Sequence, residues 1–394
     1  MTPDERIARI QSGVVDVIPA GELETRLTSG ARLRVKLGVD PTAPDIHLGH
    51  TVPLTKLRQF QDLGHTAVLI IGDFTARVGD PSGRSATRPQ LSEAEIDANA
   101  RTYTEQIFKI LDPAATEVRR NSEWFGSMGF GEVIRLASKM TVARILERDD
   151  FSKRYRSGAP ISLHEFLYPL MQGYDSVVVR SDIELGGTDQ LFNLLVGRDL
   201  QRDAGMPGQL ALLLPLLEGR DGLHKMSKTL NNHIAIADPP TEMFGKVMSI
   251  SDDLMGRYYQ LLSGASGERL QDVLLRRVHP MEAKQALAHE LVERFWGSAA
   301  AEEAQGHFRE RFQNRGDNDP VVVFTRARSD DVWICDLLKE VELASSSSDA
   351  RRLVTQGAVR VDGVKVDLTY RFRIASDRLV AVGRRRLVEV RKAE

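Results

Sequence analysis

Apolar and polar positions in the first 80 residues follow two different periods. The segments "RLRVKLGVD" (32–40) and "TAVLIIGD" (66–73) are apolar runs typical of buried strands. Residues 50–63 between them carry apolar side chains at helical spacing, and Gly64 is a typical residue for the end of a helix. A strand, a helix and a strand within about 40 residues predict a right-handed βαβ unit of a parallel sheet.

The same alternation continues toward residue 238. Segments 174–187 and 209–219 are apolar enough for further buried strands, and residues 188–206 between them have a helical pattern. The sequence therefore predicts an α/β fold, with a Rossmann-like parallel-sheet domain over residues 1–238.

The pattern changes after Asp238-Pro239-Pro240. Residues 241–313 are rich in Leu, Glu, Ala and Arg at helical spacing, and the polar stretch "NRGDNDP" (314–320) follows them. This texture predicts an α-helical domain, which we expect to occupy residues 239–325.

Residues 332–394, called the tail below, predict a small α+β module. A helix is expected within 345–357, with its N-cap at Ser348 or Asp349. The segment "VRVDGVKV" (359–366) predicts a hairpin around an Asp-Gly turn, and "DRLVAVGRRRLVEVRK" predicts another pair of strands.

Composition fits an ordinary globular protein of two or three domains, with 42% hydrophobic and 27% charged residues in 394. The sequence has no run of 18 apolar residues, and "MTPDERIARI" lacks the pattern of a signal peptide. The single Cys335 excludes a disulfide framework within the chain and a Cys-rich zinc site. We therefore expect a cytoplasmic protein without a membrane partner.

Charge is distributed unevenly around a net value of −2. The tail contains 13 Lys and Arg against 9 Asp and Glu, so it carries +4 while the rest of the chain carries −6. A basic module on an acidic body indicates an anionic partner for the module, although a solvated charged face is the alternative. The basic residues singled out are Arg351 and Arg352 on the predicted helix, Arg360 and Lys365 on the hairpin, and Arg371, Arg373 and Arg384–Arg386 beyond it.

Two histidines, His47 and His50, flank Gly49 in "DIHLGH" (45–50), where the first predicted helix begins. A polar helix face or a cap is one interpretation, and a metal site is another, although no third ligand lies at a suitable spacing. The N-terminus of a helix also suits a phosphate, because its N–H groups lack partners and its dipole is positive there. Gly49 would allow close approach, and both imidazoles would face the anion.

The stretch "HKMSKT" (224–229), called the lysine loop below, lies near the end of the predicted sheet domain. A loop with two lysines is often only a solvated surface. Lys225 and Lys228, with Ser227 between them, would also form a mobile clamp on a triphosphate. The two motifs together, in this order on one α/β domain, are far more specific than either alone.

The chain at this point resembles the class I aminoacyl-tRNA synthetases, and within them the bacterial tyrosyl-tRNA synthetases. The matching stretches are "GVDPTAPDIHLGH" (38–50), "GDPSGR" (79–84), "YPLMQGYD" (168–175), "GGTDQLFN" (186–193) and "HKMSKTLNN" (224–232). The tail resembles a small RNA-binding module first seen in a small-subunit ribosomal protein. The resemblance covers essentially the whole chain.

The resemblance implies two reactions: L-tyrosine and ATP form tyrosyl-adenylate and pyrophosphate, and the tyrosyl group then passes to the 3′ end of tRNA(Tyr). It implies catalytic roles for Thr42, His47, His50, Lys225 and Lys228. It implies contacts to ATP from Gly49, Gly187, Asp189 and the loop residues Lys225, Met226, Ser227 and Lys228. Mg²⁺ is expected as the counterion of ATP, and a homodimer is implied as well.

The resemblance also implies a tyrosine pocket. Tyr168, Gln172 and Asp175 lie at i, i+4 and i+7, so they share one face of a helix. Tyr168 and Gln172, helped by Asp80, match residues that hold the α-amino group, and Asp175 matches the acceptor of the phenolic hydroxyl. Asp40 and Gln190 match further residues of the pocket.

One position departs from the pattern of many members of the family. Lys36 stands where these carry a tyrosine that shares the substrate hydroxyl with the aspartate. Our hypothesis from the sequence is that Lys36 donates to the phenol oxygen, directly or through water.

Three other functions compete with this interpretation. A tryptophanyl-tRNA synthetase would share the sheet domain and both motifs, but typically lacks the tail and the aspartate of "QGYD". A small-molecule adenylyltransferase also uses an H-x-G-H turn, yet has no use for the helical domain and the basic tail. An RNA-binding or splicing protein that kept the fold would not need Lys225 and Lys228 together.

Overall fold

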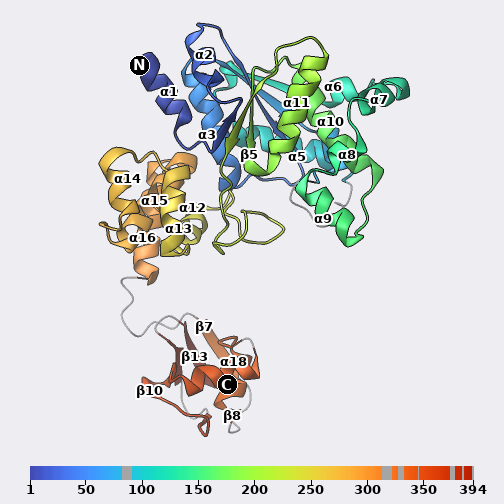
Figure 1. Cartoon of the computed structure of the whole chain (residues 1–394). Helices are drawn as coiled ribbons and strands as arrows, with labels where there is room; N and C mark the ends of the chain where they lie inside the picture. Colours follow the sequence, from blue (N-terminus) through green and yellow to red (C-terminus); the bar gives the residue numbers. More distant parts are fainter. Residues whose placement is uncertain are drawn as a thin grey trace. The chain divides into compact units, whose positions relative to one another are not determined.

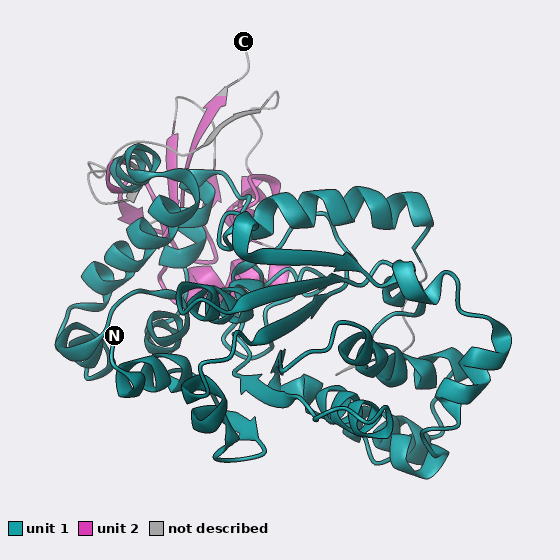
Figure 2. Cartoon of the chain, turned by 90° about the horizontal axis from the view of Figure 1, so that it is seen from above, with its two compact units in different colours: residues 1–308 teal, residues 309–394 magenta. Residues whose placement is uncertain are grey.

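The computed structural model describes residues 1–81, 91–312, 322–326, 332–344, 346–372, 378–383 and 386–392. The chain divides into two compact units, residues 1–308 (unit 1) and residues 309–394 (unit 2), which are coloured separately in Figure 2. None of the helices in the described ranges has the length and hydropathy that a membrane-spanning segment needs.

Unit 1 is built on a six-stranded sheet with the spatial order β1-β6-β5-β2-β3-β4. The strands are β1 (Asp16–Ile18), β2 (Arg34–Val39), β3 (Thr66–Ile71), β4 (Thr116–Arg120), β5 (Ile183–Gly187) and β6 (Leu210–Leu214). All neighbours are parallel except β1, which pairs antiparallel with β6 at one edge. The predicted βαβ unit is therefore confirmed as β2, α3 (Leu48–Asp62) and β3.

Helices cover both faces of this sheet (Figure 1). In β3, Ala67, Leu69 and Ile71 belong to the main hydrophobic core together with residues of α3. Val68 and Ile70 point to the other face, where they pack with Val179 just beyond α10 (Tyr168–Val178). This alternation explains why the strand is apolar throughout its length.

The remaining helices of the sheet region are mostly short. They are α1 (Pro3–Gln11), α2 (Glu22–Thr28), α4 (Thr75–Val78), α5 (Glu93–Ile107), η1 (Pro113–Ala115), α6 (Ser122–Phe125), α7 (Phe130–Ala137), α8 (Val142–Ile145), α9 (Asp149–Ser157), η2 (Leu163–Leu167), η3 (Thr188–Gln190) and α11 (Leu191–Asp203). The helix predicted within 188–206 is confirmed by α11.

The strand predicted over 174–187 is wrong in its first half. The valine run at its start ends helix α10, and β5 begins only at Ile183. Arg180, which has a positive φ of 51°, separates the two elements. A buried helix end and a buried strand are both apolar, so a short run of this kind does not distinguish them.

The residues after the sheet are helical, as the sequence predicts, and form five helices up to Phe312. They are α12 (Pro240–Met248), α13 (Asp252–Leu262), α14 (Gly267–Leu274), α15 (Pro280–Trp296) and α16 (Ser298–Phe312). Phe244 and Leu287 belong to the same core as Leu57 of α3. The hydroxyl of Tyr258 donates to the carbonyl of Glu218 at 3.0 Å, so the helical region and the sheet region are tied together within unit 1.

Unit 2 contains α17 (Ile334–Glu340), α18 (Ser347–Thr355) and a sheet with the order β10-β9-β12-β13-β7. Its strands are β7 (Val322–Arg326), β9 (Val359–Val361), β10 (Val364–Lys365), β12 (Arg378–Val382) and β13 (Arg386–Lys392), and a separate pair joins β8 (Val332–Trp333) to β11 (Arg371–Phe372). β7 lies before the start predicted for the tail and pairs parallel with β13.

Two local predictions in the tail have different outcomes. The hairpin is confirmed, because β9 and β10 are joined through Asp362 and Gly363, both at positive φ. The N-cap prediction is wrong by at least two residues. The hydroxyl of Ser346 accepts from the Asp349 N–H at 3.1 Å, so α18 begins at Ser347.

Candidate active site

Two neighbouring cavities lie where the parallel strands end, a larger cleft of about 610 Å³ and a smaller cavity of about 250 Å³. The carboxyl ends of parallel strands are the usual place for a ligand in such a sheet. Both cavities are lined by Thr42, His50, Pro53, Tyr103, Gly187 and Gln190. A ligand could therefore extend from one cavity into the other.

The larger cleft brings the two sequence motifs together. His47, Gly49 and His50 line it from the N-terminus of α3, and residues 225–229 of the lysine loop line it from the segment after β6. Met226 differs from its neighbours because its side chain is buried in the main core, while its N–H donates to the carbonyl of Leu217 at 2.8 Å. Met226 therefore fixes the loop to the sheet region.

The two imidazoles lie against each other at the start of α3, with their ring centroids 3.9 Å apart and their planes tilted by 37°. His47 is the N-cap residue, and its backbone N–H donates to Nδ1 of His50 at 3.2 Å. Because Nδ1 of His50 accepts, the ring hydrogen of a neutral His50 is on Nε2. Nδ1 of His47 is buried and finds no hydrogen-bond partner among the residues that the structure describes.

Both histidines are neutral near pH 7. Burial, followed by the neighbouring Lys225 and Lys228, lowers the pKa of His50 to about 4. Burial, followed by His50 and His233, lowers the pKa of His47 well below its ordinary range. Each ring can therefore donate one hydrogen bond to a ligand without carrying a positive charge.

Each lysine of the loop is paired with a carboxylate. Nζ of Lys225 lies 2.7 Å from Oδ2 of Asp189, and Nζ of Lys228 lies 2.9 Å from Oδ2 of Asp45. The Lys225 side chain is 50% exposed and the Lys228 side chain 25%, so an entering anion could reach both ammonium groups. Such exposed pairs are weak, which allows the lysines to exchange partners.

Asn232 holds the lysine loop in shape. Its Oδ1 accepts from the Ser227 N–H at 2.8 Å, and its Nδ2 donates to Asp221 at 3.1 Å. A Cβ on Gly219 would lie only 2.2 Å from this side chain. The loop therefore has a fixed base, while its lysines remain accessible.

Two glycines of the cleft are required by close contacts. A Cβ on Gly49 would lie 3.0 Å from the His47 ring, and a Cβ on Gly187 would lie 2.6 Å from Oδ1 of Asp189. Side chains at these positions would push on residues that line the cleft.

The smaller cavity contains Asp40, Asp80, Tyr168, Gln172 and Asp175, which the sequence resemblance assigns to one pocket. The hydroxyl of Tyr168 donates to Oδ2 of Asp40 at 2.8 Å. The hydroxyl of Thr75 donates to the other oxygen, Oδ1, also at 2.8 Å. Asp40, which follows β2, is thereby held by one side chain of α4 and one of α10.

Asp175 is a buried carboxyl group at the end of the cavity. Its Oδ1 accepts from Nε1 of Trp124 at 3.0 Å, and its Oδ2 accepts from Nδ2 of Asn121 at 3.4 Å. Burial raises the pKa of Asp175 to about 7, against the opposing effect of Lys36. A ligand hydroxyl that donates to this carboxylate would favour its ionised form.

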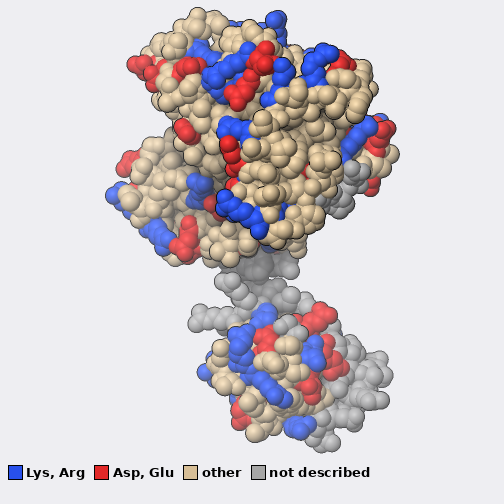
Figure 3. All heavy atoms as spheres, turned by 45° about the vertical axis from the view of Figure 1, so that its right-hand side comes forward, with Lys and Arg blue, Asp and Glu red and all other residues tan. Residues whose placement is uncertain are grey.

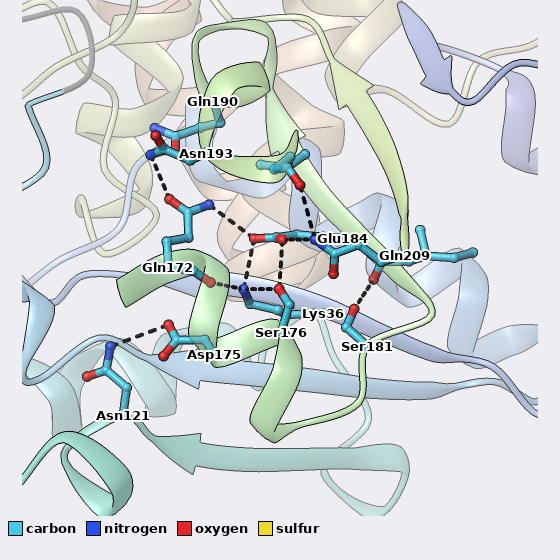
Figure 4. A network of polar contacts seen from close by, with 12 residues as sticks. Lys36, Asn121, Gln172, Asp175, Ser176, Ser181, Glu184, Gln190, Asn193 and Gln209 are labelled. Atoms are coloured by element: carbon cyan, nitrogen blue, oxygen red, sulfur yellow. Dashed lines mark hydrogen bonds and ion pairs between the residues drawn. The ribbon is translucent and has the colours of Figure 1, made fainter. Parts of the chain in front are cut away.

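A chain of polar side chains includes Gln172 and Gln190 of the smaller cavity (Figure 4). Nε2 of Gln172 donates to Glu184 at 3.0 Å, and its Oε1 accepts from Asn193 at 2.8 Å. Asn193 also donates to Oε1 of Gln190 at 3.2 Å, and Nε2 of Gln190 donates to Asp80 at 2.8 Å. Gln172 and Gln190 are thereby connected to the Asp80 carboxylate.

The contacts of Lys36 bear on our hypothesis that it donates to the phenol oxygen directly or through water. It is fully buried and is not among the residues that line the smaller cavity. Its Nζ lies 2.9 Å from Glu184, and it donates at 2.8 Å to both the carbonyl of Gln172 and the hydroxyl of Ser176. An ammonium group has three hydrogens, and these three acceptors use them all. A direct bond to a phenol would require one of these contacts to break.

Several residues around the pocket were not predicted from the sequence. Asn193 lies inside the quoted stretch 186–193, so its side chain could have been included from the motif. Glu184 and Arg148 gave no local signal. Glu184 lies inside an apolar strand, and Arg148, which donates to Asn193 at 3.1 Å, comes from a distant loop. The part that such buried polar side chains play in the pocket becomes apparent only when the fold has brought their elements together.

Those basic residues of the tail that the structure describes lie on the surface of unit 2. Figure 3 shows Lys and Arg side chains beside acidic ones on this unit. Arg351 lies over the Trp333 ring, with Cζ 5.1 Å from the centroid, and Arg352 pairs with Asp349 at 2.7 Å. Arg360 and Lys365 are exposed on the hairpin, as is Arg371 on β11. Arg373, Arg384 and Arg385 lie outside the described residues.

The described ranges contain no group of three or more His, Cys, Asp and Glu side chains arranged to hold a metal ion.

Comparison with protein families gives two matches along the chain. Residues 28–313 match the family of class I tRNA synthetases for tryptophan and tyrosine, and residues 332–379 match the S4 domain.

Comparison with individual proteins gives relatives that are similar over nearly the whole chain. A tyrosine–tRNA ligase of Thermotoga maritima is 50% identical and covers 100% of this chain and 99% of its own length. A tyrosine–tRNA ligase of Moorella thermoacetica is 52% identical over 92% of this chain and 91% of its own length.

Solved structures share the fold at lower identity. A C-terminally truncated mitochondrial tyrosyl-tRNA synthetase of Aspergillus nidulans has a TM-score of 0.65 and 22% identity, covering 79% of this chain and 94% of that one. A tyrosyl-tRNA synthetase of Archaeoglobus fulgidus has a TM-score of 0.64 and 22% identity, covering 77% of this chain and 100% of that one.

Proposed function

The chain belongs to the class I tRNA synthetases and is a tyrosine–tRNA ligase, and we propose that the residues around the two cavities divide its reaction between them. The enzyme activates L-tyrosine with ATP to tyrosyl-adenylate and pyrophosphate, and then transfers the tyrosyl group to the 3′ end of tRNA(Tyr). The observation that supports this division is the meeting of the start of α3 and the lysine loop in one cleft.

The first step needs positioning and charge stabilisation. The carboxylate of tyrosine is ionised near pH 7, so it attacks the α-phosphate without a general base. Thr42, His47 and His50 donate to the oxygens that gain charge, and the neutral rings do so without a proton transfer. Lys225 and Lys228 leave Asp189 and Asp45 to bind the departing pyrophosphate.

Tyrosine occupies the smaller cavity. Asp175 accepts from the phenolic hydroxyl, and Tyr168, Gln172 and Asp80 accept from the α-amino group, whereas Asp40 and Gln190 hold these residues in place. Phenylalanine would leave Asp175 buried without its donor. Tyrosyl-tRNA synthetases are themselves the well-known example of such discrimination, which in these enzymes is on the order of 10⁵ in favour of tyrosine.

ATP occupies the larger cleft. Gly49 and Gly187 allow its close approach, Asp189 contacts the ribose, and residues 225–228 contact the phosphates. Mg²⁺ enters as the counterion of ATP. The tRNA reaches the same place with its 3′ end, while Arg351, Arg352, Arg360 and Lys365 contact its phosphates from the tail.

A homodimer is part of the proposal. Large apolar side chains are exposed on the helices between β4 and α10, which a single copy leaves uncovered. They are Phe130, Ile134, Val142, Tyr155 and Leu163. The cytoplasm is the proposed location, since the one cysteine, Cys335, is buried and unpaired.

ATP–pyrophosphate exchange with each amino acid in turn tests the proposed function. Exchange with tyrosine, followed by charging of tRNA(Tyr), is expected. Exchange with tryptophan would favour the tryptophan enzyme, and exchange with no amino acid would contradict a synthetase altogether.

A further inference from the structure

Lys36 and Glu184 form a fully buried ion pair between the two central strands. The residues are direct partners in the register of β2 and β5, and Nζ of Lys36 lies 2.9 Å from Oε1 of Glu184. Their side chains are 0% and 1% exposed. Burying two charges is costly unless their partners are complete, so the question is what this pair does for the pocket beside it.

The Glu184 carboxylate is saturated with donors (Figure 4). Its Oε1 accepts from Lys36 and from Nε2 of Gln172, and its Oε2 accepts from Ser176 at 3.0 Å and from Nε2 of Gln209. Four donors, one of them an ammonium, fit an ionised carboxylate, which can only accept.

An ionised Glu184 determines which way the Gln172 amide faces. Because Glu184 can only accept, Gln172 must turn its NH₂ group toward Glu184 and its Oε1 toward Asn193. The far end of the chain is fixed as well, since Arg148 can only donate and points at Oδ1 of Asn193. The amide orientations between these two ends therefore have one consistent solution.

This orientation matters for what the pocket can bind. The proposed ligand group at Gln172 is an α-ammonium, which offers only donors and needs acceptors. A Gln172 amide with its Oε1 toward the pocket is such an acceptor, whereas a reversed amide would present NH₂ to a cation. A protonated Glu184 could donate to Oε1 of Gln172, and only the contact to Asn193 would then oppose the reversed amide.

We propose that Lys36 and Glu184 are positioning residues for the α-amino group of the substrate: Lys36 keeps Glu184 ionised, and Glu184 keeps the Gln172 amide turned toward that group. The inference rests on the proposed tyrosine pocket. It replaces our hypothesis that Lys36 bonds the phenol, because all three hydrogens of the ammonium already have acceptors within the network.

Two inhibitors separate the two ends of the substrate. Tyramine keeps the amino group and the phenol, whereas desaminotyrosine lacks the amino group but keeps the phenol. Their inhibition constants are measured in tyrosine-dependent ATP–pyrophosphate exchange. Wild-type enzyme that shows no tyrosine-dependent exchange would overturn the proposed function and this inference with it, before any variant is compared.

The variants are Glu184→Gln and the double variant Lys36→Met with Glu184→Gln. The double variant leaves no unpaired buried charge, so it keeps the test valid where the single variant folds poorly. In the double variant the introduced glutamine amide can donate or accept, so it no longer fixes the Gln172 amide, whereas in the single variant Lys36 still holds the amide oxygen at the place of Oε1. Lys56→Met is the matched control, because Lys56 is also a buried lysine but donates to the carbonyls of Ile10 and Ser12 and lines neither cavity.

We expect the inhibition constant of tyramine to rise between about 10- and 100-fold more than that of desaminotyrosine in the double variant, the range for a hydrogen bond to a charged group, and to rise less in the single variant. The constant of desaminotyrosine is the reference for the phenol end, because Lys36 also lowers the pKa of Asp175, and Lys56→Met should change neither constant. Equal weakening of both inhibitors, weakening of desaminotyrosine alone, no change at all, or the same selective loss in Lys56→Met would each overturn the inference.

Discussion

Nζ of Lys228 lies 2.9 Å from Oδ2 of Asp45, so the lysine loop is held against the segment that leads into α3. This contact joins residues of the two motifs before any substrate binds. It also shows the lysine in its resting position, since the same ammonium must turn to the pyrophosphate in the proposed reaction. The contact is weak enough to exchange because both partners remain partly exposed.

We expect Lys228→Ala to slow adenylate formation roughly 100-fold, the cost of removing one preorganised contact to developing charge. Tyrosine binding should not change, because Lys228 does not line the smaller cavity. Pre-steady-state adenylate formation and equilibrium binding of tyrosine measure the two effects separately. Lys246→Ala, which removes a paired lysine outside both cavities, serves as the control. An equal loss of tyrosine affinity in Lys228→Ala would contradict the assignment.

Tyrosine affinity should rise with pH through neutrality. The pKa of Asp175 is raised to about 7 in the free protein, so the carboxylate that accepts the phenol is mostly protonated at pH 6 and mostly ionised at pH 8. We expect affinity to increase about tenfold between these values and then to level off. Titration calorimetry from about pH 5.5 to 8.5 measures it, and Asp175→Asn should flatten the curve.

The Asp175 carboxyl group also affects the free energy of unfolding, which should fall with rising pH while tyrosine affinity rises. Its native pKa lies above the unfolded value, so the native protein binds more protons between about pH 4 and pH 7. The contribution of Asp175 to the free energy of unfolding therefore falls as pH rises through this window. Denaturation of wild type and Asp175→Asn across the window checks the sign.

No histidine step should appear in the rate of adenylate formation between about pH 5.5 and 8, because the pKa of His50 is lowered to about 4 and that of His47 lies lower still. His50→Asn keeps a donor, so it should lose less rate than His50→Ala.

The native pKa values of His47 and His50 both lie below the value of an unfolded histidine, so the two histidines lower the free energy of unfolding as pH falls below about 6.5. A rate limb near this unfolded value that vanishes in His50→Asn would argue for a charged imidazole.

Removing charge from the hairpin of unit 2 should weaken tRNA binding without affecting activation. Arg360→Ala and Lys365→Ala each delete an exposed cation, and each should lower the slope of log affinity against log salt by about one. Filter binding at several salt concentrations measures the slope, and pyrophosphate exchange should stay at the wild-type value. Arg391→Ala, which removes a cation paired with Glu389, is the comparison. Unchanged slopes in the hairpin variants would argue against a phosphate contact there.

Deletion of unit 2 tests whether tRNA binding depends on the tail while amino-acid activation does not. We expect pyrophosphate exchange to remain nearly intact and tRNA charging to be crippled. The cut should precede Val322, because β7 belongs to the sheet of unit 2 and a cut at residue 332 would leave this strand without β13. A truncated protein that charged tRNA(Tyr) normally would contradict a role for the tail.

Local sequence patterns predicted the parts of the fold that depend on periodicity. The β2–α3–β3 unit and the Asp362-Gly363 hairpin follow from apolar spacing and turn chemistry. The end of α10 was mistaken for a strand because its valines are buried on a helix, where a short run has no visible period. Strand β7 was missed because it pairs with the last strand of the chain, a contact between distant segments.

The candidate site also has residues that the sequence could predict and contacts that it could not. His47, His50 and the lysine loop could be recognised because their residues are contiguous in the sequence. The orientation of the Gln172 amide could not, because it depends on Glu184 and Arg148, which come from separate elements. The contacts of Lys36 could not be predicted for the same reason, since its acceptors lie on β5 and α10.

The pairing of Val388 with Val322 has a consequence for biosynthesis. The parallel ladder between β7 and β13 joins segments more than 60 residues apart in the sequence, so it cannot form until residues 386–392 have been synthesised. A nascent chain that has not yet exposed β13 thus lacks a complete RNA-binding module, although unit 1 precedes it in the sequence and can begin to fold.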